Sequence, residues 1–221
     1  MLCVTLTLFA RPATAQDVTV ASTAGPVYLG SNGAIFYDGP VLQTEAVISW
    51  VSGVFTGVWV STAGNTALDF DKEMDVFVGY GGEVRGISYM ASMMYLVMQG
   101  IDMVQVAGEV SQGPLFFKVE GYAPTQSGGL KRGIMAFGGL RTSSEIGSRT
   151  RLLMEGWVQS DTGTFGYDSA LLAQGYHGFD VAVSNKTALR LGARWSAPIT
   201  RVDDGRRTEV RWEVGASRSF K

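Results

Sequence analysis

Charged side chains recur at every second position within otherwise apolar segments of this 221-residue sequence. In 72–80, Glu73 and Asp75 alternate with apolar residues, and near the end of the chain Arg211 and Glu213 do the same. Because successive side chains of a β-strand point to opposite faces, the charged groups share one face and the apolar groups the other. The residues that this pattern predicts to line an internal wall are Glu45, Glu73, Asp75, Glu109, Lys118, Glu120, Lys186, Arg190, Arg194, Arg211 and Glu213.

These charges separate by sign along the chain. Most carboxylates fall between Glu45 and Glu120, and most basic groups fall between Lys186 and Arg211. If the segments close into a barrel, acid and base line different walls, and the field between them orients and selects small polar solutes or ions. The alternative is that the charges pair across a narrow barrel and plug it.

The sequence contains few residues that could catalyse a reaction or bind a metal ion. His177 is the only histidine and Cys3 the only cysteine, which excludes an internal disulfide and the common zinc sites. A membrane hydrolase would need a histidine at the outer rim, whereas His177 is predicted to lie in a turn beside Gly178. Asp203-Asp204-Gly205 lacks the other ligands of a calcium loop and is predicted to be a solvated loop tip. We therefore expect no metal, no cofactor and no enzymatic activity.

Composition points to a surface that only partly faces water. The chain has 29 glycines, 46 % hydrophobic residues and 17 % charged residues, and its mean hydropathy is +0.12. A soluble domain has roughly a quarter of its residues charged. Intrinsic disorder is excluded by this hydrophobicity, and a net charge of −2 without a basic stripe argues against a nucleic-acid partner.

The first residues resemble an export signal. An apolar stretch is followed by Ala13-Thr14-Ala15, a small-x-small pattern, so residues 1–15 are predicted to be a signal peptide cleaved after Ala15. The usual basic segment before the apolar stretch is missing, so either the true signal starts further upstream or the pattern is accidental. Residues 16–221 are predicted to form one domain.

No helical membrane span is expected. The uncharged stretch 46–68 is long enough for one, but it is rich in serine, threonine, glycine and strand-favouring residues. Val51-Ser52-Gly53 divides it into two strands.

Alternation and turn signals together predict about twelve strands. Short and longer connections alternate along the chain, which is typical of bacterial membrane barrels, although a soluble β-sandwich also alternates. The segment 178–196 reads as one strand, because its period of two continues through Asn185; two strands joined at Asn185-Lys186 are the alternative. The prediction is an all-β, closed, antiparallel up-and-down transmembrane barrel, with ten to fourteen strands allowed and strands near 26–37, 41–50, 54–62, 71–80, 84–96, 103–112, 115–123, 131–142, 149–160, 167–176, 178–196 and 208–220.

Large aromatic residues lie on or near the predicted strand ends. Such residues form girdles at the membrane interface of β-barrels, although the core of a soluble sandwich would use the same types. The predicted interface aromatics are Trp50, Trp59, Tyr80, Tyr89, Tyr95, Trp195 and Trp212.

The stretch 37–95 includes Trp50-Val51-Ser52-Gly53-Val54-Phe55-Thr56-Gly57-Val58-Trp59-Val60-Ser61, Glu73-Met74-Asp75-Val76-Phe77-Val78-Gly79-Tyr80 and Gly86-Ile87-Ser88-Tyr89. Through these segments above all, the stretch resembles the TorF-type porins of bacterial outer membranes. The early strand lacks the aromatic, arginine and glycine cluster of those porins, and the chain ends Phe220-Lys221 where an outer-membrane barrel usually ends on the aromatic itself.

The resemblance implies an exported outer-membrane barrel that acts as a porin. Together with the charged walls, it leads us to expect passive diffusion of small polar solutes or ions. The expected partners are the lipid bilayer, these solutes and the barrel-assembly machinery, with the oligomeric state left open. A plugged structural or adhesive barrel is the alternative, and an outer-membrane hydrolase is less favoured.

Overall fold

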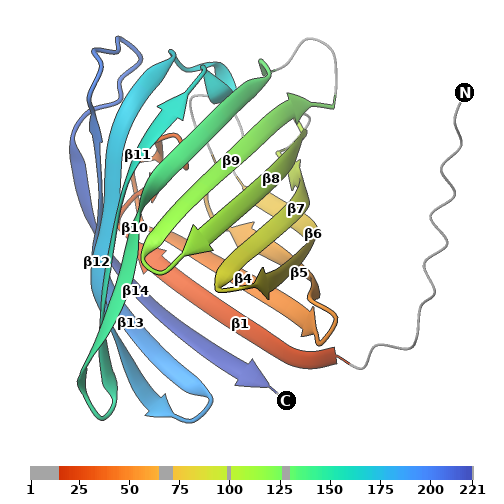
Figure 1. Cartoon of the computed structure of the whole chain (residues 1–221). Helices are drawn as coiled ribbons and strands as arrows, with labels where there is room; N and C mark the ends of the chain where they lie inside the picture. The colour runs from red at the N-terminus through yellow and green to blue at the C-terminus, as the bar shows by residue number, and fades with distance from the viewer. Residues whose placement is uncertain (1–14, 65–71, 99–100, 126–129, 221) are drawn as a thin grey trace, which may run out of the picture.

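The computed structural model describes residues 15–64, 72–98, 101–125 and 130–220. These residues form a closed antiparallel barrel of twelve strands and a separate two-stranded sheet (Figure 1), so the predicted barrel is confirmed. Of the predicted signal peptide, residues 1–14 lie outside the described residues. The barrel strands are β1 (Ala15–Gly25), β4 (Val41–Trp50), β5 (Val54–Ser61), β6 (Glu73–Val84), β7 (Ile87–Val97), β8 (Met103–Gln112), β9 (Leu115–Pro124), β10 (Gly133–Gly147), β11 (Thr150–Asp161), β12 (Ala170–Ser184), β13 (Thr187–Pro198) and β14 (Glu209–Phe220).

From β4 onward, each barrel strand pairs with the next one along the chain. The first strand closes the ring: Val20 of β1 pairs with Ala46 of β4 on one side and with Arg218 of β14 on the other. Closure leaves no strand edge unpaired, which a sheet in lipid requires.

The barrel wall is apolar outside and polar inside. On β6, Val76 is 48 % exposed while its neighbour Asp75 is 6 % exposed; on β14, Trp212 is 68 % exposed while Glu213 is 6 % exposed. This is the reverse of a water-soluble domain and matches a barrel whose outer band contacts lipid. Because the outward side chains are apolar, the chain contains few charged residues, and many of these lie on the inward face of the wall.

The predicted first strand, 26–37, is wrong. The first wall strand is β1, which ends at Gly25-Pro26, where proline has no N–H to donate to a strand partner. Residues 26–40, here called the inserted segment, then leave the wall and fold inside the barrel (Figure 1). Within it, β2 (Tyr28–Leu29) and β3 (Ile35–Tyr37) pair only with each other.

A close approach inside the inserted segment requires glycine. A Cβ atom at Gly30 would lie 2.4 Å from the ring of Phe36, and Gly33 has a φ of 76° in the turn between β2 and β3. Both positions allow the segment to fold tightly enough to fit within the lumen.

The single strand predicted over 178–196 is also wrong. The structure has a turn at Asn185-Lys186, and β12 runs unbroken through His177, which is exposed on the outer face rather than in a turn. A bulge explains the misleading periodicity. Because Ala182 pairs with Ala188, inward residues keep the same parity on both strands.

Two kinds of connection mark the two ends of the barrel. Short turns, such as Arg85-Gly86 and Ser148-Arg149, lie at the turn end, where β1 begins and β14 ends (Figure 1). Longer connections, including 162–169 and 199–208, lie at the loop end. A helical turn, η2 (Thr164–Gly166), is all the helix in the described part of the chain, too short to span a bilayer.

Candidate functional site

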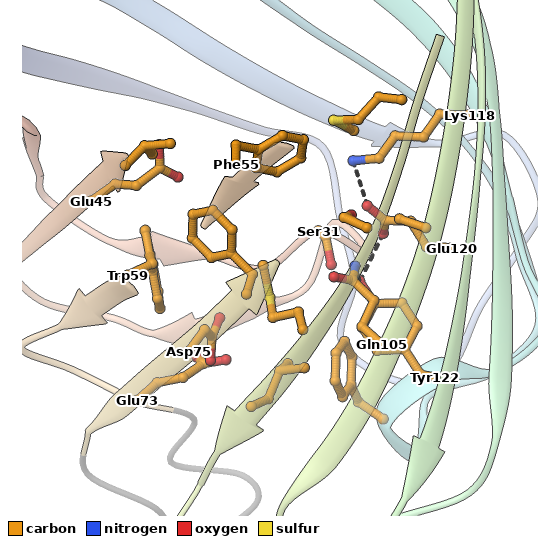
Figure 2. Close-up of a pocket in the computed structure, with 18 of the residues that line it drawn as sticks. Ser31, Glu45, Phe55, Trp59, Glu73, Asp75, Gln105, Lys118, Glu120 and Tyr122 are labelled. Carbon is orange, nitrogen blue, oxygen red and sulfur yellow. Dashed lines mark hydrogen bonds and ion pairs between the residues drawn. The ribbon is translucent and has the colours of Figure 1, made fainter. Parts of the chain in front are cut away.

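The barrel interior contains a cavity of about 450 Å³. Its wall includes Glu45 of β4, Glu73 and Asp75 of β6, and Lys118 and Glu120 of β9 (Figure 2). All five are among the residues that the alternation predicted to face inward. We call this space the large cavity.

The β6 side of the large cavity carries carboxyl groups that have no basic partner. Glu73 and Asp75 are each 6 % exposed. Glu73 accepts a hydrogen bond of 2.7 Å from Tyr28, whereas Oδ1 of Asp75 has no partner among the described residues. Within the described chain, neither these two carboxyl groups nor that of Glu45 forms an ion pair, so this wall carries acidic groups without a basic partner.

Aromatic rings form much of the remaining lining, and one of them corrects a prediction. Trp59 was expected at the membrane interface, but it lines the large cavity and its ring centroid lies 6.0 Å from that of Tyr28. Trp59 pairs with Asp75 and therefore shares its inward face. Phe55 and Phe77 also line the cavity.

The β9 side of the large cavity is a paired network. Nζ of Lys118 lies 2.5 Å from the Glu120 carboxylate, and the Tyr122 hydroxyl donates to the same carboxylate at 2.7 Å. The side-chain amide of Gln105 donates to the Tyr122 hydroxyl at 2.6 Å (Figure 2). The positive charge of Lys118 is thus largely neutralised.

The basic wall predicted from the last strands is present but internally paired. Asp180 binds Arg190 at 2.7 Å, and Glu213 binds both Arg194 at 3.1 Å and Arg211 at 2.8 Å. The expectation of wholly separate acidic and basic walls is therefore wrong for these strands, because carboxylates alternate into the same face. Lys186 lies in the exposed β12–β13 turn and not on the wall.

A second cavity, of about 200 Å³, lies between the two walls and shares Lys118 with the first. Arg141 lines it and bridges Glu109 and Glu155 at 3.1 Å each. Sequence analysis missed Asp180, Arg141 and Glu155 as wall residues. Each lies at an inward position of a strand, so the period of two applied strictly would have found them.

The inserted segment is held from several sides of the wall. Arg211 donates to the backbone carbonyl of Val27 at 2.7 Å, and Gln174 donates to that of Ser31 at 3.2 Å. On the β6 side, Tyr28 donates to Glu73. Burial, and then the charge of Glu73, raise the pKa of the Tyr28 hydroxyl well above its usual value, so it remains a donor.

A cluster of aromatic rings joins the inserted segment to the loop end. Phe36 packs edge-on against Phe165 of η2 at 5.6 Å between centroids, and Phe165 packs against Tyr122 at 5.0 Å. Phe165 adopts a left-handed conformation with φ of 60°, which is uncommon for a bulky residue. Aromatic rings from the inserted segment, η2 and β9 therefore pack together at the loop end of the lumen.

Arg206 was not predicted to be structural, yet its side chain is fully buried. It binds Asp161 at 3.0 Å and Asp204 at 2.7 Å, and it donates to the carbonyls of Asn32 and Asp168. The prediction that Asp203-Asp204-Gly205 is a solvated loop tip is therefore wrong for Asp204, which binds Arg206, whereas Asp203 is exposed as predicted. One guanidinium joins the inserted segment to both neighbouring loops.

The other predicted interface aromatics share the outward face of their strands. Tyr80, Tyr95 and Trp212 are 48 %, 41 % and 68 % exposed. Tyr95 also donates to Asp102 at 2.9 Å. Those on the outward face are Trp50, Tyr80, Tyr89, Tyr95, Trp195 and Trp212.

The closed ring, the apolar exterior and the charged interior define a transmembrane-type β-barrel with a polar lumen. Solved structures with the same fold include the NanC porin (TM-score 0.57, 10 % identity, covering 91 % of this chain and 98 % of that one) and the KdgM porin (0.56, 8 %, 93 % and 99 %). An outer membrane channel from Pseudomonas putida F1 is also similar (0.58, 8 %, 96 % and 97 %). No protein-family model and no curated protein matches the sequence.

Proposed function

We propose that the protein is a porin of the bacterial outer membrane that allows small polar solutes or ions to diffuse passively. The observation that carries this proposal is a charged cavity of about 450 Å³ inside a closed barrel with an apolar exterior. In a lumen filled only by packed side chains, carboxyl groups without an ion-pair partner, such as those of Glu45, Glu73 and Asp75, would be costly. Its structural neighbours include porins, which supports the proposal.

The inserted segment sets the size limit in this proposal. It occupies the loop end of the lumen, and the second cavity lies beside it. Solutes pass along the inserted segment or displace it, so only small ones cross readily. The same arrangement leaves no histidine near the lumen, since His177 faces outward, and we propose that the protein is not an enzyme.

Membership of the TorF-type porins is part of the proposal, on the likeness of the stretch 37–95. So are export by the signal peptide of residues 1–15 and insertion by the barrel-assembly machinery. One solved neighbour is a KdgM porin in complex with disordered oligogalacturonate, a polyanion. The acidic wall of this chain disfavours such a solute, so a shared permeant is not proposed.

A plugged structural or adhesive barrel is the second candidate. The fully buried Arg206 side chain favours it, because its contacts with four residues hold the inserted segment at the loop end. A fixed segment would leave the cavity without a path to the outside.

Liposome swelling tests the proposal. The purified full chain is reconstituted, and swelling is followed in solutes of graded size and charge. Swelling that falls with solute size supports a porin, and a well-inserted barrel that admits none of them contradicts it. Slower gel migration after heating verifies that the barrel is folded before each assay.

A further inference from the structure

Carboxyl groups outnumber basic groups in the lining of the large cavity, as they do at a cation site. Four carboxylates line it, from Glu45, Glu73, Asp75 and Glu120, against one basic group among the described lining residues, Lys118. That ammonium is already paired with Glu120 at 2.5 Å. Buried carboxylates without a positive partner are costly, so a cation that enters is stabilised.

Asp75 shows where a partner is missing. The residue is 94 % buried, since only 6 % of it is exposed, yet its Oδ1 accepts no hydrogen bond from a described residue. Most buried polar atoms in proteins have a partner. In Figure 2, Asp75 lies near Glu73 and Trp59, on the side of the cavity away from Lys118.

The aromatic lining favours an organic cation over a metal ion. Trp59, Phe55 and Phe77 line the same space. An ammonium group is attracted electrostatically to the face of an aromatic ring, while Ca²⁺ or Mg²⁺ requires a shell of oxygen ligands that aromatic rings do not supply. The cavity volume of about 450 Å³ also falls within the range of small-molecule sites.

From this geometry we infer that the large cavity binds small organic ammonium compounds. The carboxylates of Asp75 and Glu73 bind the positive group, and Trp59 packs against its methyl or methylene groups. The inference rests on the proposed function for its role, which is to make the porin selective for such cations; the binding itself needs only the cavity.

Choline and its neutral isostere 3,3-dimethyl-1-butanol are suitable probes. Binding of each to the detergent-purified full chain is measured by titration calorimetry. Choline should bind saturably and about tenfold more tightly than the isostere, from charge attraction and contact with the rings. Equal affinity for the two compounds would overturn the inference without any variant.

Three variants locate the site. Asp75→Asn keeps the side-chain shape and should weaken choline binding by about tenfold, and Trp59→Leu should weaken it by several-fold. Glu145→Gln is the matched control, because it removes one carboxylate outside the large cavity and should leave choline binding unchanged. If Asp75→Asn binds choline like the unaltered chain, the site is not at Asp75.

Bilayer currents separate this inference from the proposed function. If choline binds in the expected pattern but no current flows, the porin proposal fails and the site remains. If current flows but choline binds no better than its isostere, the site fails and the porin proposal remains.

Discussion

The guanidinium of Arg206 and the carboxylate of Asp161 form an ion pair of 3.0 Å in which both side chains are fully buried. The other oxygen of Asp161 accepts the backbone N–H groups of Gly163 and Thr164, at 3.0 and 2.8 Å. Since Arg206 also donates to the carbonyl of Asn32, this pair connects the end of β11, the η2 loop and the inserted segment.

Replacing Arg206 with leucine should destabilise the loop end strongly. Removing one partner of a buried pair leaves an uncompensated charge, which costs about 3–5 kcal/mol. Unfolding in urea, followed by tryptophan fluorescence in detergent, measures the loss. Adding Asp161→Asn to Arg206→Leu removes the stranded charge and should recover part of the stability; a double variant no more stable than the single one would argue against the pair.

Replacing Tyr28 with phenylalanine should loosen the inserted segment. The change removes its hydrogen bond to Glu73 and leaves a buried carboxylate without that donor, at a cost of about 1–3 kcal/mol. We expect larger or noisier currents in planar bilayers. Tyr37→Phe is the control in the same segment, because the Tyr37 hydroxyl has no hydrogen-bond partner among the described residues. Identical currents for both variants would show that the Tyr28 contact does not hold the segment.

Acid should release the loop 199–208. Burial raises the pKa of Asp204, but the hydrogen bonds from Arg206 and from the backbone of Asp168 outweigh it and hold the pKa below its usual value. A carboxyl group with a lowered pKa stabilises the fold above its unfolded pKa of about 3.9, and this stability is lost as pH falls through the folded pKa.

Hydrogen exchange at the amide of Asp168, which donates to Asp204 at 2.8 Å, measures this release. After correction for intrinsic rates, its protection should stay constant from about pH 7 to 5 and fall below about pH 4. Asp204→Asn should remove that pH dependence. A variant that loses protection over the same acid range as the unaltered chain would assign the change to another group.

Placing arginine at Val78 should destabilise the barrel in lipid. This side chain is 45 % exposed on the outer face of β6, between the levels of Tyr80 and Tyr95, and a charge near mid-bilayer costs about 2–4 kcal/mol. Val51→Arg, in the exposed β4–β5 turn, is the control and should cost little. Refolding equilibria in vesicles measure both. Equal, small effects would indicate that the β6 face contacts water.

Much of the wall could be predicted from sequence because the signal is local. The predicted strands 41–50 and 103–112 match β4 and β8, since alternation of apolar and polar residues fixes both the strand and its inward face. The same reasoning placed Glu73 and Asp75 inside. It misplaced Trp59, because aromatic residues near strand ends occur on either face and only parity decides between them.

The contacts inside the lumen could not be predicted, because they join distant parts of the chain. Arg206 contacts Asn32, 174 residues away, and Asp161, 45 residues away. The segment 26–37 is rich in strand-favouring residues, and only the pairing of β1 with β4 shows that the wall has no place for it. The inserted segment lies in the lumen because the barrel closes without it, and this closure depends on pairing between distant strands.

The conductance of single barrels in planar bilayers tests the porin proposal most directly. The unaltered chain is compared with a variant in which residues 27–39 are replaced by a short glycine-serine link, which should conduct well and so proves insertion. We expect the unaltered chain to carry smaller, steady currents that favour cations. If it carries no current where the shortened variant conducts, the inserted segment seals the barrel and the protein is not a porin.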